Sequence, residues 1–170
     1  TIPRQILIDD MIWLKMKSME WNVSVPSRVE KQITDLFNSG NEEQICMADY
    51  YAAMCLREKN PKKYIHAKTS AQKIYQCYHY DYRQRKQGEL VDDFKVYPEY
   101  ISFIQIMQDK MIEYIEDKQL VIECCPSSNV KIGRLKYYDC HPIFRFCDVR
   151  NEGFHHLPVT INTDDLGIFY

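Results

Sequence analysis

Leu157-Pro158-Val159-Thr160-Ile161-Asn162-Thr163-Asp164-Asp165-Leu166-Gly167, close to the C-terminus, is the most informative stretch of the chain. Residues 158–161 are apolar and β-branched and lie between a proline and polar residues, which predicts a short buried strand. Two adjacent carboxylates, Asp164 and Asp165, follow this strand, at the position where α/β sheets place their chemistry. Thr-Asp-Asp is also typical of a helix N-cap, and a helix could begin near Leu166.

A second stretch has the same design. Residues 120–129 form an apolar run that ends in a polar segment broken by Pro126. About thirty residues separate the two runs, which is enough for a crossover connection between parallel strands. We therefore expect parallel strands at residues 120–124 and 159–162, preceded by a helix that ends near Asp117.

Three motifs in this order resemble the last part of the adenosine deaminase family. They are Glu123-Cys124-Cys125-Pro126-Ser127-Ser128-Asn129, then His141-Pro142-Ile143, then residues 158–167. The family has Glu-x-Cys-Pro-x-Ser-Asn at its seventh barrel strand and Asn-Thr-Asp-Asp-Pro at its eighth, where Leu166 here replaces the proline. The resemblance covers residues 120–170 and implies an α/β fold, the C-terminal fragment of a TIM-type (β/α)8 barrel.

The resemblance also implies a chemistry. It implies a hydrolase that deaminates adenosine, or an adenine nucleotide such as ATP, to the inosine product. The cofactor would be zinc or another divalent metal, which makes hydroxide available by lowering the pKa of bound water to roughly 7. Carried over to this chain, Asp164 would be a metal ligand that also holds the attacking water. Asp165 would hydrogen-bond the substrate's purine ring at its imidazole-side nitrogen.

The remaining parts of such a site are not found in this sequence. The chain contains no His-x-His, no His-Ala-Glu and no His-Gly. Two parallel strands cannot close a barrel or satisfy their own edges. We therefore expect a fragment that is inactive by itself, whose partner is the rest of the barrel polypeptide, carrying the other metal ligands and the acid–base glutamate upstream of Thr1.

The first part of the chain predicts helices only. Apolar spacing and capping residues predict helices over residues 4–20, 24–39, 41–60, 62–87 and 98–117, with a loop over 87–96. We divide the chain into a helical insertion, residues 1–96, and the last part of the barrel, residues 97–170. A large helical insertion resembles the defence-associated bacterial adenosine deaminases, including RADAR-type and CRISPR-associated members.

The aromatic and methionine side chains of the helical part suggest contacts between copies in a homo-oligomer, because such residues are enriched at interfaces. The ones we single out are Trp13, Met16, Met19, Trp21, Phe37, Tyr50, Tyr51, Met54, Tyr75 and Tyr78. Packing within the chain is the alternative. A non-catalytic helical assembly or interaction module that carries a degenerate barrel remnant is the alternative function.

Composition and charge argue against nucleic acid and membranes as partners. The 170 residues carry a net charge of −2 and are 45% hydrophobic, so no bulk attraction to nucleic acid or membrane is evident. No apolar run approaches the ~20 residues of a membrane span, and the start is not a signal peptide. Residues 62–87 mix tyrosines with lysines and arginines, as nucleic-acid binders do, but a half-exposed helix explains them better. The seven cysteines, without a Cys-x-x-Cys pair, favour a reducing, cytoplasmic location.

Several polar residues have two interpretations. Glu123 and residues 127–129 could face the substrate, but we favour loop geometry around Pro126 as their explanation. Cys124 and Cys125 are expected to be packing thiols, since no neighbouring base would activate them. His141 is expected to cap residues 143–146. A cytidine-deaminase type of zinc site is excluded because the chain lacks both His-x-Glu and Pro-Cys-x-x-Cys.

Overall fold

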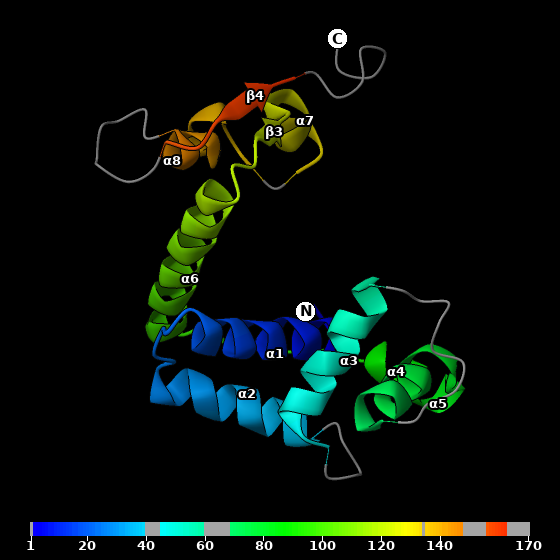
Figure 1. Cartoon of the computed structure of the whole chain (residues 1–170). Helices are drawn as coiled ribbons and strands as arrows, with labels where there is room; N and C mark the ends of the chain where they lie inside the picture. Colours follow the sequence, from blue (N-terminus) through cyan, green and yellow to red (C-terminus); the bar gives the residue numbers. More distant parts are fainter. Residues whose placement is uncertain (1, 40–44, 60–68, 134, 148–155, 163–170) are drawn as a thin grey trace. The chain divides into compact units, whose positions relative to one another are not determined.

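The computed structural model describes residues 2–39, 45–59, 69–133, 135–147 and 156–162, which form two compact units, Thr1–Met107 and Gln108–Tyr170 (Figure 1). The first unit contains β1 (Ile2–Pro3), α1 (Arg4–Glu20), α2 (Ser27–Ser39), α3 (Met47–Lys59), α4 (Ser70–Tyr80), α5 (Tyr82–Gly88), β2 (Val91–Asp92) and the first half of α6 (Pro98–Asp117). The second contains the rest of α6, then β3 (Ile122–Cys124), α7 (Pro126–Lys131), a 3-10 turn (Tyr138–Cys140), α8 (Ile143–Phe146) and β4 (Val159–Ile161). The predicted helices over residues 4–20 and 98–117 are confirmed.

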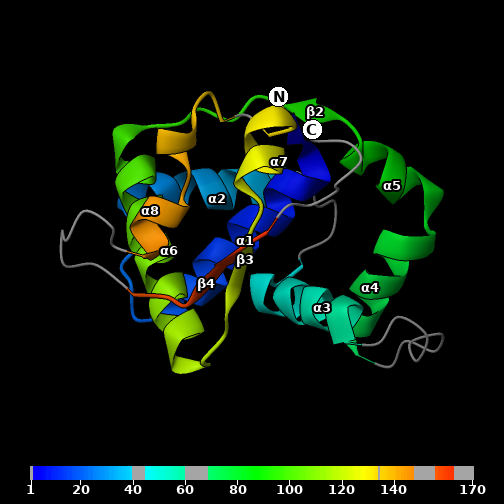
Figure 2. The same ribbon diagram turned by 90° about the horizontal axis from the view of Figure 1, so that it is seen from above.

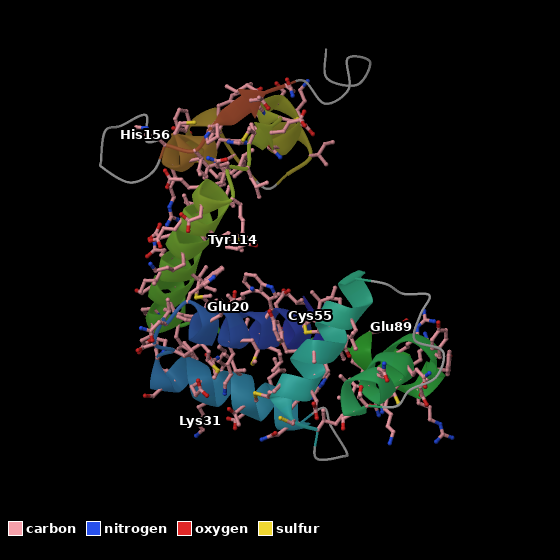
Figure 3. All side chains as sticks on the ribbon, viewed as in Figure 1. Glu20, Lys31, Cys55, Glu89, Tyr114 and His156 are labelled. Atoms are coloured by element: carbon pink, nitrogen blue, oxygen red, sulfur yellow. The ribbon has the colours of Figure 1, made fainter. Side chains whose placement is uncertain are left out.

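The core of the first unit is built by α1, α2, α3 and the start of α6. In α2, Val29, Ile33 and Phe37 recur every four residues and so form one buried stripe, while Lys31 points away from α1 (Figure 3). The other buried members of this core are Leu7, Ile8, Met11, Ile12, Tyr50, Met54, Phe103 and Met107. The sequence pattern of apolar residues therefore predicts the inner faces of these helices correctly.

Polar contacts join the helices of this unit at the edge of the core. The Tyr50 hydroxyl of α3 donates to Asp9 Oδ1 of α1 over 2.6 Å, and Lys15 of α1 forms an ion pair with Glu30 of α2. The turn after α1 has Asn22 at φ 53°, a left-handed conformation that asparagine tolerates better than most residues. This turn sends α2 back along α1.

Most of the side chains that we expected at an interface between copies pack inside this unit instead. Phe37, Tyr50 and Met54 are buried in the core, and Trp13, Met16, Trp21 and Tyr51 pack against it. Met19 is 66% exposed, and the side chains of Tyr75 and Tyr78 lie outside the described residues. The burial of these residues therefore satisfies their apolar surface without a second copy, and the homo-oligomer stays a prediction.

The single helix predicted over residues 62–87 is wrong in its described part. Two helices, α4 and α5, meet at Asp81 and are drawn as separate segments in Figure 2. Asp81 has extended backbone (ψ 117°), and its carboxylate accepts hydrogen bonds from the backbone N–H groups of Arg83 and Gln84. This is an N-cap, and it starts a new helix where apolar periodicity alone predicted continuity. Residues 62–68 lie outside the described part.

The loop predicted over residues 87–96 contains β2, which pairs antiparallel with β1. Ile2 lies opposite Asp92 and Pro3 opposite Val91, and the Arg4 guanidinium binds the Asp92 carboxylate at 3.0 Å. Gly88 packs directly on Gln5, where an added Cβ would come within 2.8 Å of the Gln5 Cβ. The two-residue strands are too short to be recognised by a pattern of period two.

The second unit confirms the two parallel strands. Ile122 pairs with Val159 and Cys124 with Ile161, in parallel register. The backbone bonds that flank this ladder run from Ile122 N–H to Pro158 O (3.0 Å) and from Asn162 N–H to Cys124 O (2.9 Å). Strand β3 follows α6 through Gln119, which has φ 54°.

The expected α/β barrel fragment is only partly present. The described residues are mostly helical, with one two-stranded antiparallel sheet and one two-stranded parallel sheet, and they contain no closed barrel. Within the same residues, no helix is long and apolar enough to cross a membrane.

Two isoleucines on α1 test the core. Ile12 is 1% exposed and Ile6 is 51% exposed. In the intact protein, Ile12→Ala should lower the free energy of unfolding by about 2–5 kcal/mol, because it leaves a cavity in the core. The matched Ile6→Ala variant should change it by no more than about 0.5 kcal/mol. Urea unfolding followed by circular dichroism measures both, and equal losses would contradict this assignment of the core.

Candidate functional site

The ends of β3 and β4 form the candidate site. Glu123 lies in register with Thr160, and Asn162 follows two residues later, so the three side chains lie on one face of the two-stranded sheet. All three are exposed. The opposite face carries Ile122, Cys124, Val159 and Ile161, and Cys124 is buried. A polar face therefore leads to the point at which both strands end.

Asn162 is joined to β3 twice. Its backbone N–H donates to Cys124 O over 2.9 Å, and its side-chain Nδ2 donates to Glu123 Oε1 over 2.5 Å. The two bonds hold the residue that precedes Thr163. The strand thus ends at a residue held by both its main chain and its side chain.

The segment after β3 is a helix rather than the turn that we expected around Pro126. Pro126 is the first residue of α7, where its fixed φ favours a helix and its missing N–H costs no helical hydrogen bond. Ser128 is 8% exposed, and Asn129 presents its Oδ1 to the buried His141. Asn129 therefore has a structural partner, which is the side chain of His141 rather than the backbone group that we expected.

His141 caps α8, as predicted. The backbone N–H of Ile143 donates to His141 Nδ1 over 3.1 Å, and His141 Nε2 lies 3.0 Å from Asn129 Oδ1. One tautomer satisfies both contacts, with the hydrogen on Nε2. The ring is 6% exposed, so a buried imidazole links α7 to α8.

The short helix α8 also contacts α6 and the residue that precedes β4. Arg145 donates to Gln108 Oε1 over 2.7 Å and also pairs with the Asp109 carboxylate, both on α6. The carbonyl of Phe146 accepts from the backbone N–H of Leu157, which is 4% exposed and precedes β4. The start of β4 is thus tied to α6 through α8.

Cys124 of β3 is a packing residue, as expected, while Cys125 follows the strand and is only partly buried. Cys124 is 5% exposed and is not part of a disulfide bond. Burial raises the pKa of the Cys124 thiol, and the nearby thiols of Cys147 and Cys125 raise it further. Because the thiolate is the reactive form, Cys124 is poorly suited to be a nucleophile.

The two carboxylates at the centre of the prediction, Asp164 and Asp165, lie outside the described residues. Among the residues that are described, no group of three or more His, Cys, Asp and Glu could hold a metal ion. The chain therefore supplies no complete metal site from residues 2–39, 45–59, 69–133, 135–147 and 156–162. A site that includes Asp164 would need ligands from elsewhere.

Sequence reasoning found the strand ends but missed the contacts that join them. The Asn162–Glu123 and Asn129–His141 bonds each link two of the three motifs that carried the resemblance. Each pair consists of a hydrogen-bond donor and an acceptor, so the sequence did contain residues able to bond. The strand register was needed to show that Glu123 and Asn162 meet.

A family model described as adenosine deaminase matches residues 49–170, which is more than half of the chain. The chain belongs to the adenosine deaminase family. The matched range includes most of α3, all of α4 and α5, and the β3–β4 pair. No solved structure matches the chain.

Curated relatives match a smaller part. The adenosine deaminase of Plasmodium falciparum (isolate 3D7) is 33% identical over 60 residues, which are 35% of this chain and 15% of that protein. The adenosine deaminase of Shewanella denitrificans is 33% identical over 63 residues, 37% of this chain and 17% of that protein. That of Plasmodium gallinaceum is 34% identical over 64 residues, 38% of this chain and 16% of that protein. The chain thus aligns with about a sixth of these relatives.

Removing the buried imidazole should loosen the link between α7 and α8. In the intact protein, His141→Ala should cost about 1–3 kcal/mol of stability, because the Ile143 N–H loses its acceptor in a partly buried position. Hydrogen exchange of a peptide covering residues 141–147 should rise in the same variant. The control is His156→Ala, since His156 (labelled in Figure 3) is exposed. Equal effects of the two substitutions would contradict the capping role.

Thiol labelling tests the environment of Cys124. At neutral pH, iodoacetamide should modify exposed Cys46 and Cys77 well before Cys124. Because burial raises the Cys124 pKa, its labelling rate should rise at a higher pH than that of an ordinary thiol, near 8.5. Mass spectrometry of labelled peptides follows each site, and urea-unfolded protein, in which all sites should react alike, is the control. Fast labelling of native Cys124 at neutral pH would contradict the assignment.

Proposed function

We propose that this chain is part of a metal-dependent hydrolase that deaminates adenosine or an adenine nucleotide to the inosine product. Membership of the adenosine deaminase family supports the reaction class. The observation that carries the proposal is the parallel pair β3–β4, whose carboxyl ends bring Glu123 and Asn162 together. Parallel strands of α/β enzymes present their functional residues at this end.

Asp164 and Asp165 are the residues to which we assign the chemistry. Both follow the held residue Asn162 in the chain, with Thr163 between Asn162 and Asp164. We assign one metal-ligand oxygen to Asp164, together with a hydrogen bond to the attacking water. We assign to Asp165 a hydrogen bond to the imidazole-side nitrogen of the purine. The adjacent carboxylates would then serve metal and substrate separately.

The donor set fits one part of a zinc site. Zinc accepts carboxylate oxygens at about 2.0–2.2 Å together with imidazole nitrogens, and a catalytic site needs three protein ligands. Asp164 supplies one such oxygen, and we assign the others to the rest of the polypeptide. When bound, the metal supplies a nucleophilic hydroxide at neutral pH.

Apolar side chains in and next to β3 and β4 are exposed, which indicates that another part of the protein packs on the strand pair. Leu120, Val121 and Ile161 are 51%, 59% and 68% exposed. Helices or further strands normally cover the apolar face of a parallel sheet, so the face that carries Ile161 calls for such a cover. We assign that cover to the remaining barrel polypeptide.

The proposal has two versions, which differ in the preferred substrate: free adenosine or ATP. Preference for free adenosine fits a metabolic deaminase, and preference for ATP fits the defence-associated branch. Comparing the rates of inosine and ITP formation by the intact protein distinguishes them. If the metal-loaded intact protein forms neither inosine nor ITP, the alternative function, a non-catalytic helical module, is favoured.

Two alanine substitutions in the intact protein test the assigned roles. Asp164→Ala should abolish measurable deamination and lower the bound metal, because it removes one of the few protein ligands of the metal. Asp165→Ala should weaken substrate binding and turnover but leave the metal in place. Metal content by mass spectrometry and inosine formation by chromatography measure both. Asp117→Ala is the control, since Asp117 is exposed at the end of α6.

Normal metal content and activity in the Asp164→Ala variant would overturn the assignment of the ligand. Loss of metal in the Asp165→Ala variant would show that the two roles are exchanged or shared. A loss of activity in Asp117→Ala as large as in Asp164→Ala would show that the effect is not specific to the site.

A further inference from the structure

We propose that Glu123 and Asn162 form a positioning pair, which sets the direction in which the chain leaves β4 toward Asp164 and Asp165. The proposal rests on the function assigned above, because it concerns the placement of the same two carboxylates. Neither Glu123 nor Asn162 is assigned a contact with substrate or metal. Their role is to act through the residues that follow them.

Register places the two side chains together. Glu123 is the backbone partner of Thr160 in the parallel ladder. Side chains alternate along a strand, so Asn162 lies on the same face as Thr160 and therefore on the same face as Glu123. The 2.5 Å bond from Asn162 Nδ2 to Glu123 Oε1 connects neighbouring strands at the end of the sheet.

The chemistry of the pair fixes one orientation of the asparagine. A carboxylate only accepts hydrogen bonds, so the Asn162 amide must turn its NH₂ group toward Glu123. The donor then meets a charged acceptor, which makes a shorter and stronger bond than a neutral pair does. With its backbone N–H already held by Cys124 O, Asn162 is fixed at both its main chain and its side chain.

Exposure argues for geometry rather than stability as the purpose of this bond. Glu123 and Asn162 are both exposed, whereas the buried side chains of the unit include Cys124, Ile112 and Leu157. Exposed polar pairs add little to the stability of a fold. Placement, in contrast, matters greatly, because an error of about 1 Å at a catalytic group can cost about 100-fold in rate.

An exchange of the two functional groups tests the pair in the intact protein. Asn162→Asp puts two carboxylates side by side, and their repulsion should push the strand end away. Glu123→Gln alone should be mild, since the Gln amide oxygen still accepts from Asn162. Asn162→Asp combined with Glu123→Gln restores a donor–acceptor pair with the polarity reversed. Gln119→Glu, which adds a charge at an exposed position just before β3, is the control.

Two measurements read the result. The first is kcat/KM for deamination, which should fall by up to about 100-fold in Asn162→Asp and return to within about threefold of the parent in the double variant. The second is hydrogen exchange of a peptide covering residues 157–167, which should rise in Asn162→Asp and return to the parental rate in the double variant. Gln119→Glu should change neither.

Rescue by the double variant is the decisive outcome. If the double variant is as impaired as Asn162→Asp in both measurements, or if Asn162→Asp exchanges like the parent, the positioning pair is wrong. Hydrogen exchange does not need activity. A parent protein that binds metal but deaminates nothing would overturn the proposed function, while the exchange arm would still confirm or overturn the pair.

Discussion

Two backbone hydrogen bonds, from Ile122 N–H to Pro158 O and from Asn162 N–H to Cys124 O, close the parallel pairing of β3 and β4. The other features of the second unit depend on this pairing. It fixes the register in which Glu123 faces Thr160, and a shift of one residue would move the polar side chains to the opposite face. The pairing therefore determines that the polar residues of two distant motifs meet.

The contacts around the pairing explain how so small a sheet keeps its register. Arg145 ties α8 to α6, the buried His141 ties α8 to α7, and the carbonyl of Phe146 holds Leu157 just before β4. The first two links join helices to one another, and the third attaches the start of β4 to α8. The helical first unit has a different basis, since its stability comes from the apolar stripes of α1, α2, α3 and the start of α6.

The sequence predicts the long, strongly periodic elements well. Helices α1 and α6 begin and end where apolar spacing and capping signals place them, and β3 and β4 are parallel as their connection length implied. The break at Asp81 was missed because one aspartate served as an N-cap inside a run whose periodicity continued on both sides. The β1–β2 pair was missed because two-residue strands carry almost no pattern.

The candidate site was predictable in its residue types but not in its contacts. Glu123 and Asn162 stood out as parts of motifs, yet only the register shows that they bond to each other. His141 was predicted to cap α8, whereas its second partner, Asn129, depends on α7 being a helix. Side-chain pairing between separate motifs is a tertiary property, which local propensity does not contain.

The distance along the chain between β3 and β4 has a consequence for folding during synthesis. The core of the first unit uses residues up to Met107, so it can form as soon as α6 has left the ribosome. Strand β3 has no β4 to pair with until residues 159–162 have been made, and closing so long a loop is slow. The candidate site is consequently assembled late, after the helices that precede it.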